Sequence, residues 1–436
     1  MFGLCDPNWH ASRSLVGRIP VSLTQILKLH ATAMPTSTAS VSIPQRVWQA
    51  GMHIPQLDGV RGLAILLVTL YRFSKEIPVD TWLGQILHSG FGLGNRGVDL
   101  FFVLSGFLIT GILVDTKGQA NYFQHFFSRR SLRIFPLYFV ALLLFLVVLP
   151  RSGFFPGVFD QAIQNQAYLW TYMANVKMGM EGAWCFGVLD PFWSLAVEEQ
   201  FYFVWPIIIF MVSSRVALRL AIGLAVMSAG TRVAFATLSS NGVAPDVLSI
   251  FRFDALLIGA ALALQIRTTR GLEPLKFWVL PVLAVCLAAG MGLDLLGKRM
   301  STVGHTLWPI AWACVCVYLL NATPRHWLAR FFNTAGLKNL GRYSYAMYVF
   351  QTPLIPLTAG VLSVSLLTGW VGNSLVANLV YMGLMFGLTY GAALLSWNVL
   401  ERHCLSLKRY FPTDGTRPPA FRRQRLIDGV HQLASK

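Results

Sequence analysis

Long apolar runs, separated by short polar connections, are the main pattern of this sequence. A transmembrane α-helix needs about 20 apolar residues, and fewer where neighbouring helices cover its ends. The stretches that meet or approach this length are 58–73, 94–114, 133–150, 199–213, 217–238, 247–265, 277–297, 303–321, 343–363 and 375–398. The pattern therefore predicts an all-α integral membrane protein with about ten transmembrane helices in one bundle.

Connections rich in Lys and Arg alternate along the chain with connections that have few, and this alternation predicts the orientation in the membrane. Beyond the basic N-terminal arm, the longer basic connections are 115–133, 266–276 and 322–342. Because positively charged connections stay on the cytoplasmic side, we expect both termini in the cytoplasm and the chain in the cell (inner or plasma) membrane. The predicted parts are a disordered cytoplasmic N-terminal arm (1–50), a transmembrane domain (54–405) and a basic cytoplasmic C-terminal tail (406–436).

The composition agrees with this fold class and excludes others. Hydrophobic residues make up 55% of the chain and charged residues 12%, about half the charge density of an ordinary soluble domain. The net charge of +17 comes largely from residues beside apolar runs, which favours contact with anionic membrane lipids and not with nucleic acid. The six cysteines have neither metal-ligand spacing nor a disulfide framework, so we expect no metal and no tightly bound cofactor.

The first apolar run carries ionisable residues on one helical stripe. Asp58, Arg61 and Arg72 share a face with Ile65 and Val68, and about 16 Å of helix separates Arg61 from Arg72. Because a guanidinium inside a membrane is costly, this stripe indicates a polar chamber within the bundle. The alternative is that the two arginines extend to opposite interfaces.

Further ionisable residues follow in the next two runs. Arg96 and Asp99 are three residues apart and can pair on one helix face. Arg129, Arg130 and Arg133 cluster at the expected cytoplasmic end of the third run. They either follow the general excess of positive charge on that side or bind the phosphates of a cytoplasmic donor.

Two adjacent carboxylates, Glu198 and Glu199, stand at the start of the fourth run. Because carboxylates are costly to bury in a membrane helix, at least one should find a partner or carry a proton, which makes the pair a candidate acid or base. The preceding connection, 151–198, is long and rich in Trp and Tyr. It is either a functional loop or an aromatic belt at the lipid interface.

In their order along the chain, these segments resemble the acyltransferase 3 family. The resemblance extends over about residues 54–405 and is carried by segments 57–61, 97–109, 129–136, 193–202 and 341–348, together with Arg252, Gly259, Ser396 and Glu401. It implies a ten-helix enzyme that transfers an acyl group, usually acetyl from acyl-CoA, to a hydroxyl of a glycan, lipid-linked sugar or small metabolite.

The resemblance and the placement of polar residues together define the expected site. The expected catalytic residues are Arg61, Arg72, Asp99, Glu198 and Glu199. The residues expected to bind the acyl-CoA donor are Arg129, Arg130, Arg133 and Arg342. The residues expected to bind the acceptor are Asp58, Trp193, Ser194, Tyr202, Arg252, Tyr345 and Gln351. We expect Arg72 to polarise the acyl carbonyl and Glu199 or Glu198 to accept the hydroxyl proton.

The chain departs from the family pattern at two positions. Arg72 and Gln351 stand where the family has histidines, the first of which the resemblance implies to be the catalytic base. Because a guanidinium stays protonated, Arg72 is no ordinary base. One alternative is therefore a catalytically impaired member that binds glycan or lipid or regulates other membrane proteins. A transporter is another, since polar stripes also line solute paths. We expect His305 and the other histidines to be hydrogen-bonded or interfacial.

Overall fold

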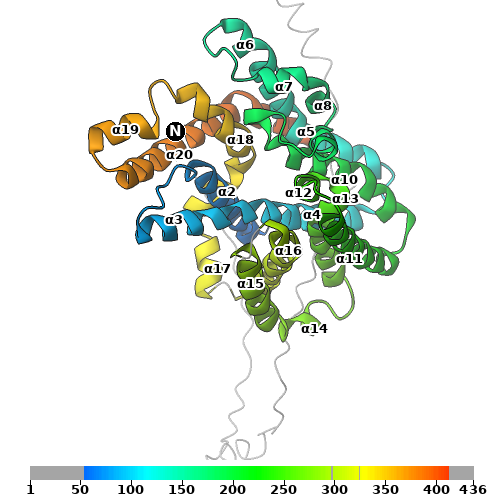
Figure 1. Ribbon diagram of the computed structural model, residues 1–436. Coiled ribbons are helices and arrows are strands. Elements are labelled where there is room, and N and C mark those ends of the chain that lie inside the picture. Colours follow the sequence, from blue (N-terminus) through cyan, green and yellow to red (C-terminus); the bar gives the residue numbers. More distant parts are fainter. Residues whose placement is uncertain (1–53, 296–297, 324, 412–436) are drawn as a thin grey trace, which may run out of the picture. The chain divides into compact units, whose positions relative to one another are not determined.

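The computed structural model describes residues 54–295, 298–323 and 325–411. Within these ranges the chain forms helices and no strand, so the all-α fold class is confirmed (Figure 1). The predicted N-terminal arm, 1–50, lies outside the described residues, as does the predicted tail beyond residue 411.

Each of the apolar stretches predicted from the sequence overlaps one long helix. These helices are α2 (Pro55–Phe73), α4 (Gly97–Thr116), α5 (Tyr122–Leu143), α10 (Phe192–Met211), α11 (Ser214–Leu238), α13 (Ser249–Ile266), α15 (Val279–Leu295), α16 (Lys298–Asn321), α18 (Ala335–Thr358) and α20 (Ser374–Ser396). The shorter helices are α3 (Trp82–Gly92), η1 (Leu93–Arg96), η2 (Leu144–Val148), α6 (Leu149–Ser152), α7 (Asp160–Gln164), α8 (Gln166–Trp170), α9 (Ala174–Glu181), η3 (Gly187–Leu189), α12 (Ala244–Val247), α14 (Glu273–Lys276), α17 (Trp327–Phe332), α19 (Val364–Val371), η4 (Trp397–Glu401), α21 (Arg402–Ser406) and η5 (Leu407–Tyr410).

Several helical stretches are suited to cross a membrane. In the described part of the chain, 6 stretches are long and apolar enough, and they contain α4, α5, α10, α11, α13 and α20. This number indicates a multi-pass membrane protein. Helix α2 is not among them because Asp58, Arg61 and Arg72 interrupt its apolar sequence.

Two helices begin earlier than the apolar runs predicted. Helix α5 begins at Tyr122, so residues 117–121 alone connect it to α4, and the predicted loop 115–133 is wrong. Helix α10 begins at Phe192, which places Glu198 and Glu199 inside the helix. The loop before α10 is also largely helical, since it contains α7, α8, α9 and η3. The arginines and carboxylates are therefore held on helices and not on loop ends.

Close helix packing brings polar residues of distant segments together. Helix α2 packs against α18, and α4 packs against α13. A Cβ atom at Gly341 of α18 would overlap the main-chain oxygen of Asp58, and one at Gly62 of α2 would overlap that of Leu337. Small residues allow this close approach in membrane helices. The starts of α2 and α18 consequently lie against each other.

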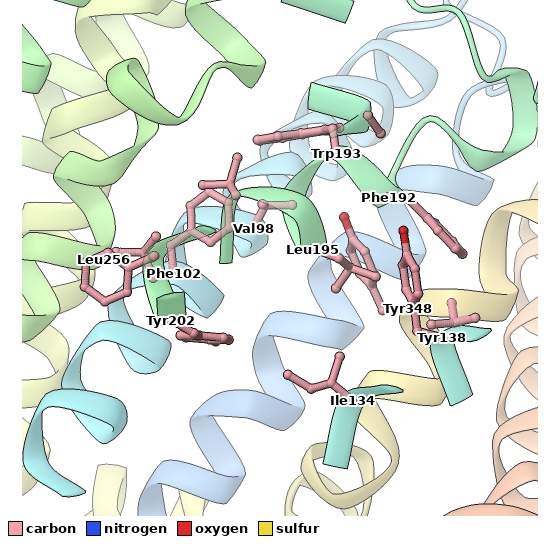
Figure 2. Packing of buried hydrophobic residues seen from close by; sticks show 14 of the residues in the cluster. Val98, Phe102, Ile134, Tyr138, Phe192, Trp193, Leu195, Tyr202, Leu256 and Tyr348 are labelled. Carbon is pink, nitrogen blue, oxygen red and sulfur yellow. The ribbon is translucent and has the colours of Figure 1, made fainter. Parts of the chain in front are cut away.

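One cluster of buried hydrophobic residues draws members from several of these helices. It includes Phe102 from α4, Tyr138 from α5, Trp193 from α10, Leu256 from α13 and Tyr348 from α18. Figure 2 shows these side chains together with their neighbours. The cluster packs the helices that carry the candidate site.

Candidate active site

A pocket of about 730 Å³, including the space at its mouth, is lined by residues of α2, α4, α5, α10 and α18. Its polar lining residues are Arg61, Ser105, Arg130, Arg133, Ser194, Glu198, Glu199, Ser344, Tyr345 and Tyr348. Its apolar lining residues are Val98, Phe101, Phe102, Ile134 and Leu195, several of which Figure 2 labels. The structure thus joins both predicted carboxylates to Arg61 and to two of the predicted donor-binding arginines.

Glu198 is firmly paired within this pocket. The hydroxyl of Tyr202, one helical turn away, donates to Glu198 Oε2 at 2.6 Å. Nη2 of Arg130 lies 3.8 Å from the same oxygen and also donates to the Tyr202 hydroxyl. The guanidinium of Arg130 lies over the Tyr202 ring, 4.0 Å from its centroid. Glu198 and Arg130, which are 68 residues apart in the sequence, are therefore neighbours.

Glu199 lines the same pocket but differs from Glu198 in its hydrogen bonding. Its Oε1 atom is buried and has no hydrogen-bond partner among the described residues. A buried carboxylate oxygen without a partner is costly, so such atoms are rare in folded proteins outside functional sites. Of the two adjacent carboxylates, Glu199 is the one with an oxygen available to a ligand.

A second pocket adjoins the first and shares Arg61, Arg133 and Tyr345 with it. Its lining adds Lys338 and Arg342 from the start of α18, together with Asp58 and Glu401. The Arg342 guanidinium lies over Trp397, 4.4 Å from the ring centroid. Several fixed cations around one pocket suit a ligand with more than one negative charge.

Arg129 lines neither pocket, although the sequence grouped it with Arg130 and Arg133. Its Nη1 atom donates to the main-chain oxygen of Phe411 at 2.8 Å. A second, longer contact of 3.5 Å joins it to the oxygen of Lys408. Arg129 therefore holds the end of the described chain against α5, and this geometry gives no support to a donor-binding role.

The two residues that depart from the family pattern lie on helices that pack together. Arg72, on α2, has a buried Nε atom without a partner among the described residues. Gln351, on α18, is fully buried and accepts a hydrogen bond from the Thr69 hydroxyl at 3.1 Å. Neither side chain lines either of the two pockets.

Arg72 acts electrostatically on the loop that precedes α10. Burial raises the pKa of the Asp190 carboxyl to about 6, while a hydrogen bond from the Phe186 main-chain N–H and the positive charge of Arg72 oppose this rise. Asp190 Oδ1 accepts that hydrogen bond at 2.8 Å. Arg72 is therefore close to this loop.

Asp99 and Arg252 form a separate buried cluster. They pair with each other, and Arg96 lies 3.9 Å from Asp99 while pairing with Asp294. His305 Nδ1 lies 3.0 Å from Arg96 Nη1 and 2.6 Å from Arg252 Nη1. Because guanidinium groups only donate, Nδ1 accepts from both.

This cluster stands outside the pocket linings, and its carboxylates are paired, although the buried Nε of Arg252 has no partner among the described residues. His305 Nε2 carries the hydrogen that it donates to Asp246 Oδ1 at 3.1 Å. The Arg252 guanidinium lies 5.7 Å from the centroid of Phe102, whose side chain lines the first pocket. The predicted catalytic role of Asp99 and the predicted acceptor contact of Arg252 therefore gain no support from the pocket linings.

The other predicted acceptor residues divide between the pockets and their surroundings. Ser194 shares a hydrogen bond of 2.6 Å with the Tyr348 hydroxyl, and Tyr345 donates to the main-chain oxygen of Ile134 at 2.9 Å. Ser194 and Tyr345 line the first pocket, whereas Asp58 lines only the second, and Trp193 and Tyr202 line neither.

Three polar residues of the first pocket, Ser105, Ser344 and Tyr348, received no role from the sequence. All three belong to segments that resemble the acyltransferase 3 family. Position within those segments was the only signal that pointed to them.

Comparison with known families agrees with this arrangement. The model of a family described as an acyltransferase domain matches residues 54–397. This range contains all five helices that line the first pocket, from α2 to α18. The chain belongs to this acyltransferase family. The helices and the pocket are therefore those of an acyltransferase domain.

Individual relatives can be named. Peptidoglycan O-acetyltransferase OatA of Listeria monocytogenes is 29% identical over 341 residues, which are 72% of this chain and 51% of OatA. YrhL of Bacillus subtilis is 30% identical over 337 residues, 71% of this chain and 50% of YrhL. O-acetyltransferase OatA of Staphylococcus aureus is 24% identical over 333 residues, 70% of this chain and 51% of that protein. The chain thus spans about half the length of these curated relatives. No solved structure matches it.

Proposed function

We propose that the chain is an O-acyltransferase that transfers an acyl group, acetyl from acyl-CoA, to a hydroxyl of a glycan, lipid-linked sugar or small metabolite at the membrane. The observation that carries this proposal is the unpartnered Glu199 Oε1 in a pocket that also contains Arg61, Arg130 and Arg133. The names of the Listeria and Staphylococcus relatives support acetyl transfer, and the former supports a glycan acceptor.

The proposed reaction uses Glu199 as the general base. Glu199 Oε1 accepts the proton of the acceptor hydroxyl as that oxygen attacks the acyl carbonyl carbon. The carbon–sulfur bond then breaks, and the proton passes to the leaving thiolate. Arg61 lines the pocket, so we assign it the stabilisation of the developing oxyanion in place of Arg72. Glu198 keeps Arg130 and Tyr202 in position.

The second pocket is the proposed binding site for the phosphates of the acyl-CoA donor. Arg133, Lys338 and Arg342 provide the positive charge for the phosphates, while Arg61, which also lines this pocket, is assigned to the acyl carbonyl. One guanidinium group can form two parallel hydrogen bonds to the oxygens of a phosphate, and several such groups suit a diphosphate. Because the two pockets share Arg61 and Arg133, a donor held by its phosphates can place its acyl end beside Glu199.

The proposed topology has about ten membrane spans with both termini in the cytoplasm of a cell (inner or plasma) membrane. The overlap of each apolar run with a long helix and the alternation of basic connections support it. In this orientation α2 and α18 both begin on the cytoplasmic side. The second pocket, lined by the first turns of both helices, then faces the compartment that contains acyl-CoA.

A catalytically impaired member that binds glycan or lipid is the second candidate. The observation that favours it is the absence of histidine at positions 72 and 351, where Gln351 is instead hydrogen-bonded to Thr69. Arg72→His and Gln351→His, singly and together, separate the two candidates. Transfer by the double variant alone would favour the impaired member, whereas transfer by the native chain favours the enzyme.

The direct test of the enzyme uses Glu199→Gln in the full chain, with radiolabelled acetyl-CoA and isolated cell-wall glycan. We expect transfer to fall by about 10² to 10⁴, the usual contribution of a general base. Glu273→Gln is the matched control, because Glu273 is exposed, pairs with Lys276 and lines neither pocket. Full activity of Glu199→Gln would remove this carboxylate from the mechanism.

A further inference from the structure

Tyr172, between α8 and α9 in the loop before α10, has an unusual main-chain conformation. It is the one non-glycine residue in the described ranges with a positive φ, +56°. A bulky side chain rarely adopts this left-handed region, which costs on the order of 1 kcal/mol or more. Surrounding contacts must therefore hold Tyr172 in place.

Contacts to two helices fix both the main chain and the ring of Tyr172. The side chain of Gln200, the residue after Glu199, donates to the Tyr172 main-chain oxygen at 2.9 Å. The Tyr172 ring stacks on Tyr138 of α5, with centroids 4.1 Å apart and planes 18° apart. The Tyr138 hydroxyl in turn donates to the main-chain oxygen of Leu169 at 2.7 Å. Tyr172 is thus held against both α5 and α10.

The Tyr172 hydroxyl is buried and has no hydrogen-bond partner among the described residues. Burial raises the pKa of Tyr172 far above its ordinary value, and the nearby Tyr345 hydroxyl and Glu199 carboxyl raise it further. The phenol therefore keeps its proton and remains a hydrogen-bond donor. Glu199 directly precedes Gln200, whose side chain holds the Tyr172 main-chain oxygen, and its Oε1 is a buried acceptor that also has no partner in the described part of the chain.

We propose that Tyr172 and Glu199 bind one and the same hydroxyl group of the acceptor, an inference that rests on the proposed function. A hydroxyl both accepts and donates, so one such group satisfies both buried atoms. A carbonyl oxygen would satisfy Tyr172 alone, and an ammonium group would satisfy Glu199 alone. The ligand class that matches both is an alcohol, such as a sugar hydroxyl.

Tyr172 has a defined part in the proposed transfer. Its O–H donates to the acceptor oxygen and orients a lone pair of that oxygen, while the acceptor hydrogen points to Glu199 Oε1. The oxygen–carbon bond to the acyl group forms as the carbon–sulfur bond of the acyl thioester breaks. The proton moves from the acceptor to Glu199 and then to the thiolate, and Tyr172 keeps its own proton throughout.

Tyr172→Phe tests this proposal, because it removes the hydroxyl and keeps the stacked ring. Tyr168→Phe is the matched control: Tyr168 is exposed in the same loop segment, beside Lys177. The full chain is assayed with radiolabelled acetyl-CoA and N,N′-diacetylchitobiose as the acceptor probe. For Tyr172→Phe we expect the KM of the probe to rise about tenfold, the loss of one hydrogen bond. The KM of acetyl-CoA and the thermal unfolding midpoint should match those of Tyr168→Phe.

Two results separate this inference from the proposed function. An unchanged KM for the probe in Tyr172→Phe would overturn the inference and leave the enzyme intact. If the native chain transfers no label, the proposed function fails, and binding of the probe by saturation-transfer NMR decides the inference. Weaker binding in Tyr172→Phe but not in Tyr168→Phe supports the hydroxyl site. Equal binding by all three proteins, or binding by none, overturns it.

Discussion

The Tyr202 hydroxyl donates to Glu198 at 2.6 Å, and this bond distinguishes two carboxylates that are adjacent in the sequence. Glu198 is tied to Tyr202 and lies near Arg130, whereas Glu199 keeps a buried oxygen without a partner among the described residues. A paired carboxylate and a carboxylate with an oxygen available to a ligand therefore occupy consecutive positions of one helix. The two residues should respond differently to the same substitution.

Glu198→Gln is expected to lower the stability of the folded chain and to have a smaller effect on the rate of acetyl transfer. The substitution leaves Arg130 buried without its carboxylate, a loss of about 1–3 kcal/mol. We expect a lower thermal unfolding midpoint with acetyl transfer reduced no more than about tenfold per folded molecule. Glu199→Gln should show the reverse, with little change in the midpoint and much lower transfer. Equal effects of both variants on transfer would contradict this division.

Removing positive charge from the second pocket should weaken donor binding through its phosphates. We expect Lys338→Gln and Arg342→Gln each to raise the KM of acetyl-CoA by about tenfold, since each removes a charge-assisted contact. S-acetylpantetheine, which lacks the phosphates, should react equally well with the variants and with the native chain. Arg402→Gln is the control, because Arg402 is exposed and lines neither pocket. Equal sensitivity of both donors would argue against phosphate binding here.

Asp99→Asn should impair folding and leave the chemistry largely intact. Breaking a buried ion pair costs about 3–5 kcal/mol because the remaining charge is uncompensated. We therefore expect less folded protein but near-native transfer per folded molecule. The double variant Asp99→Asn/Arg252→Gln should recover part of the yield, since no charge of the pair remains. Loss of transfer in well-folded Asp99→Asn would return Asp99 to the catalytic set.

Asp190 should make stability depend on pH in a definite direction. Burial raises the pKa of its carboxyl to about 6 in the folded chain, above the value of about 4 expected when unfolded. The folded state then binds the proton more tightly, so its contribution favours folding at pH 4 and is lost as pH rises through 6. Asp190→Asn keeps an acceptor for the Phe186 N–H and cannot titrate. We expect its unfolding midpoint to exceed the native one at pH 7, and the difference to shrink towards pH 4.5.

Gly341→Ala should separate α2 from α18 and so disturb both pockets. Its Cβ atom would overlap the main-chain oxygen of Asp58. We expect a large loss of folded protein, measured as yield of monodisperse material in detergent. Gly387→Ala on α20 is the control, because a Cβ atom at Gly387 meets nothing within 4 Å. Similar yields from both variants would show that this helix contact tolerates a methyl group.

The apolar runs predicted the positions of the long helices well, because each long apolar run overlaps one long helix. They placed the starts of α5 and α10 too late, because the charged residues in the N-terminal halves of these helices suggested loops. Arg130 and Glu198 belong to helix interiors because each compensates the other's charge across 68 residues of sequence. A sequence pattern within one run does not contain that information.

The choice of ion-pair partners was also beyond sequence reasoning. Asp99 has Arg96 three residues away, yet its close partner is Arg252, 153 residues further along. Helix packing, not local spacing, selects between such partners. The membership of Glu198 and Glu199 in one site was predictable from adjacency and cost of burial, whereas the contrast between them depends on Tyr202 and Arg130.

The wall common to the two pockets has a kinetic consequence. Arg61, Arg133 and Tyr345 line both pockets. A molecule long enough to reach from one pocket into the other therefore blocks the passage between them. In the proposed reaction, a bound donor of this length keeps bulk water of its own side away from the thioester. Hydrolysis of the donor is then limited by the bound donor itself.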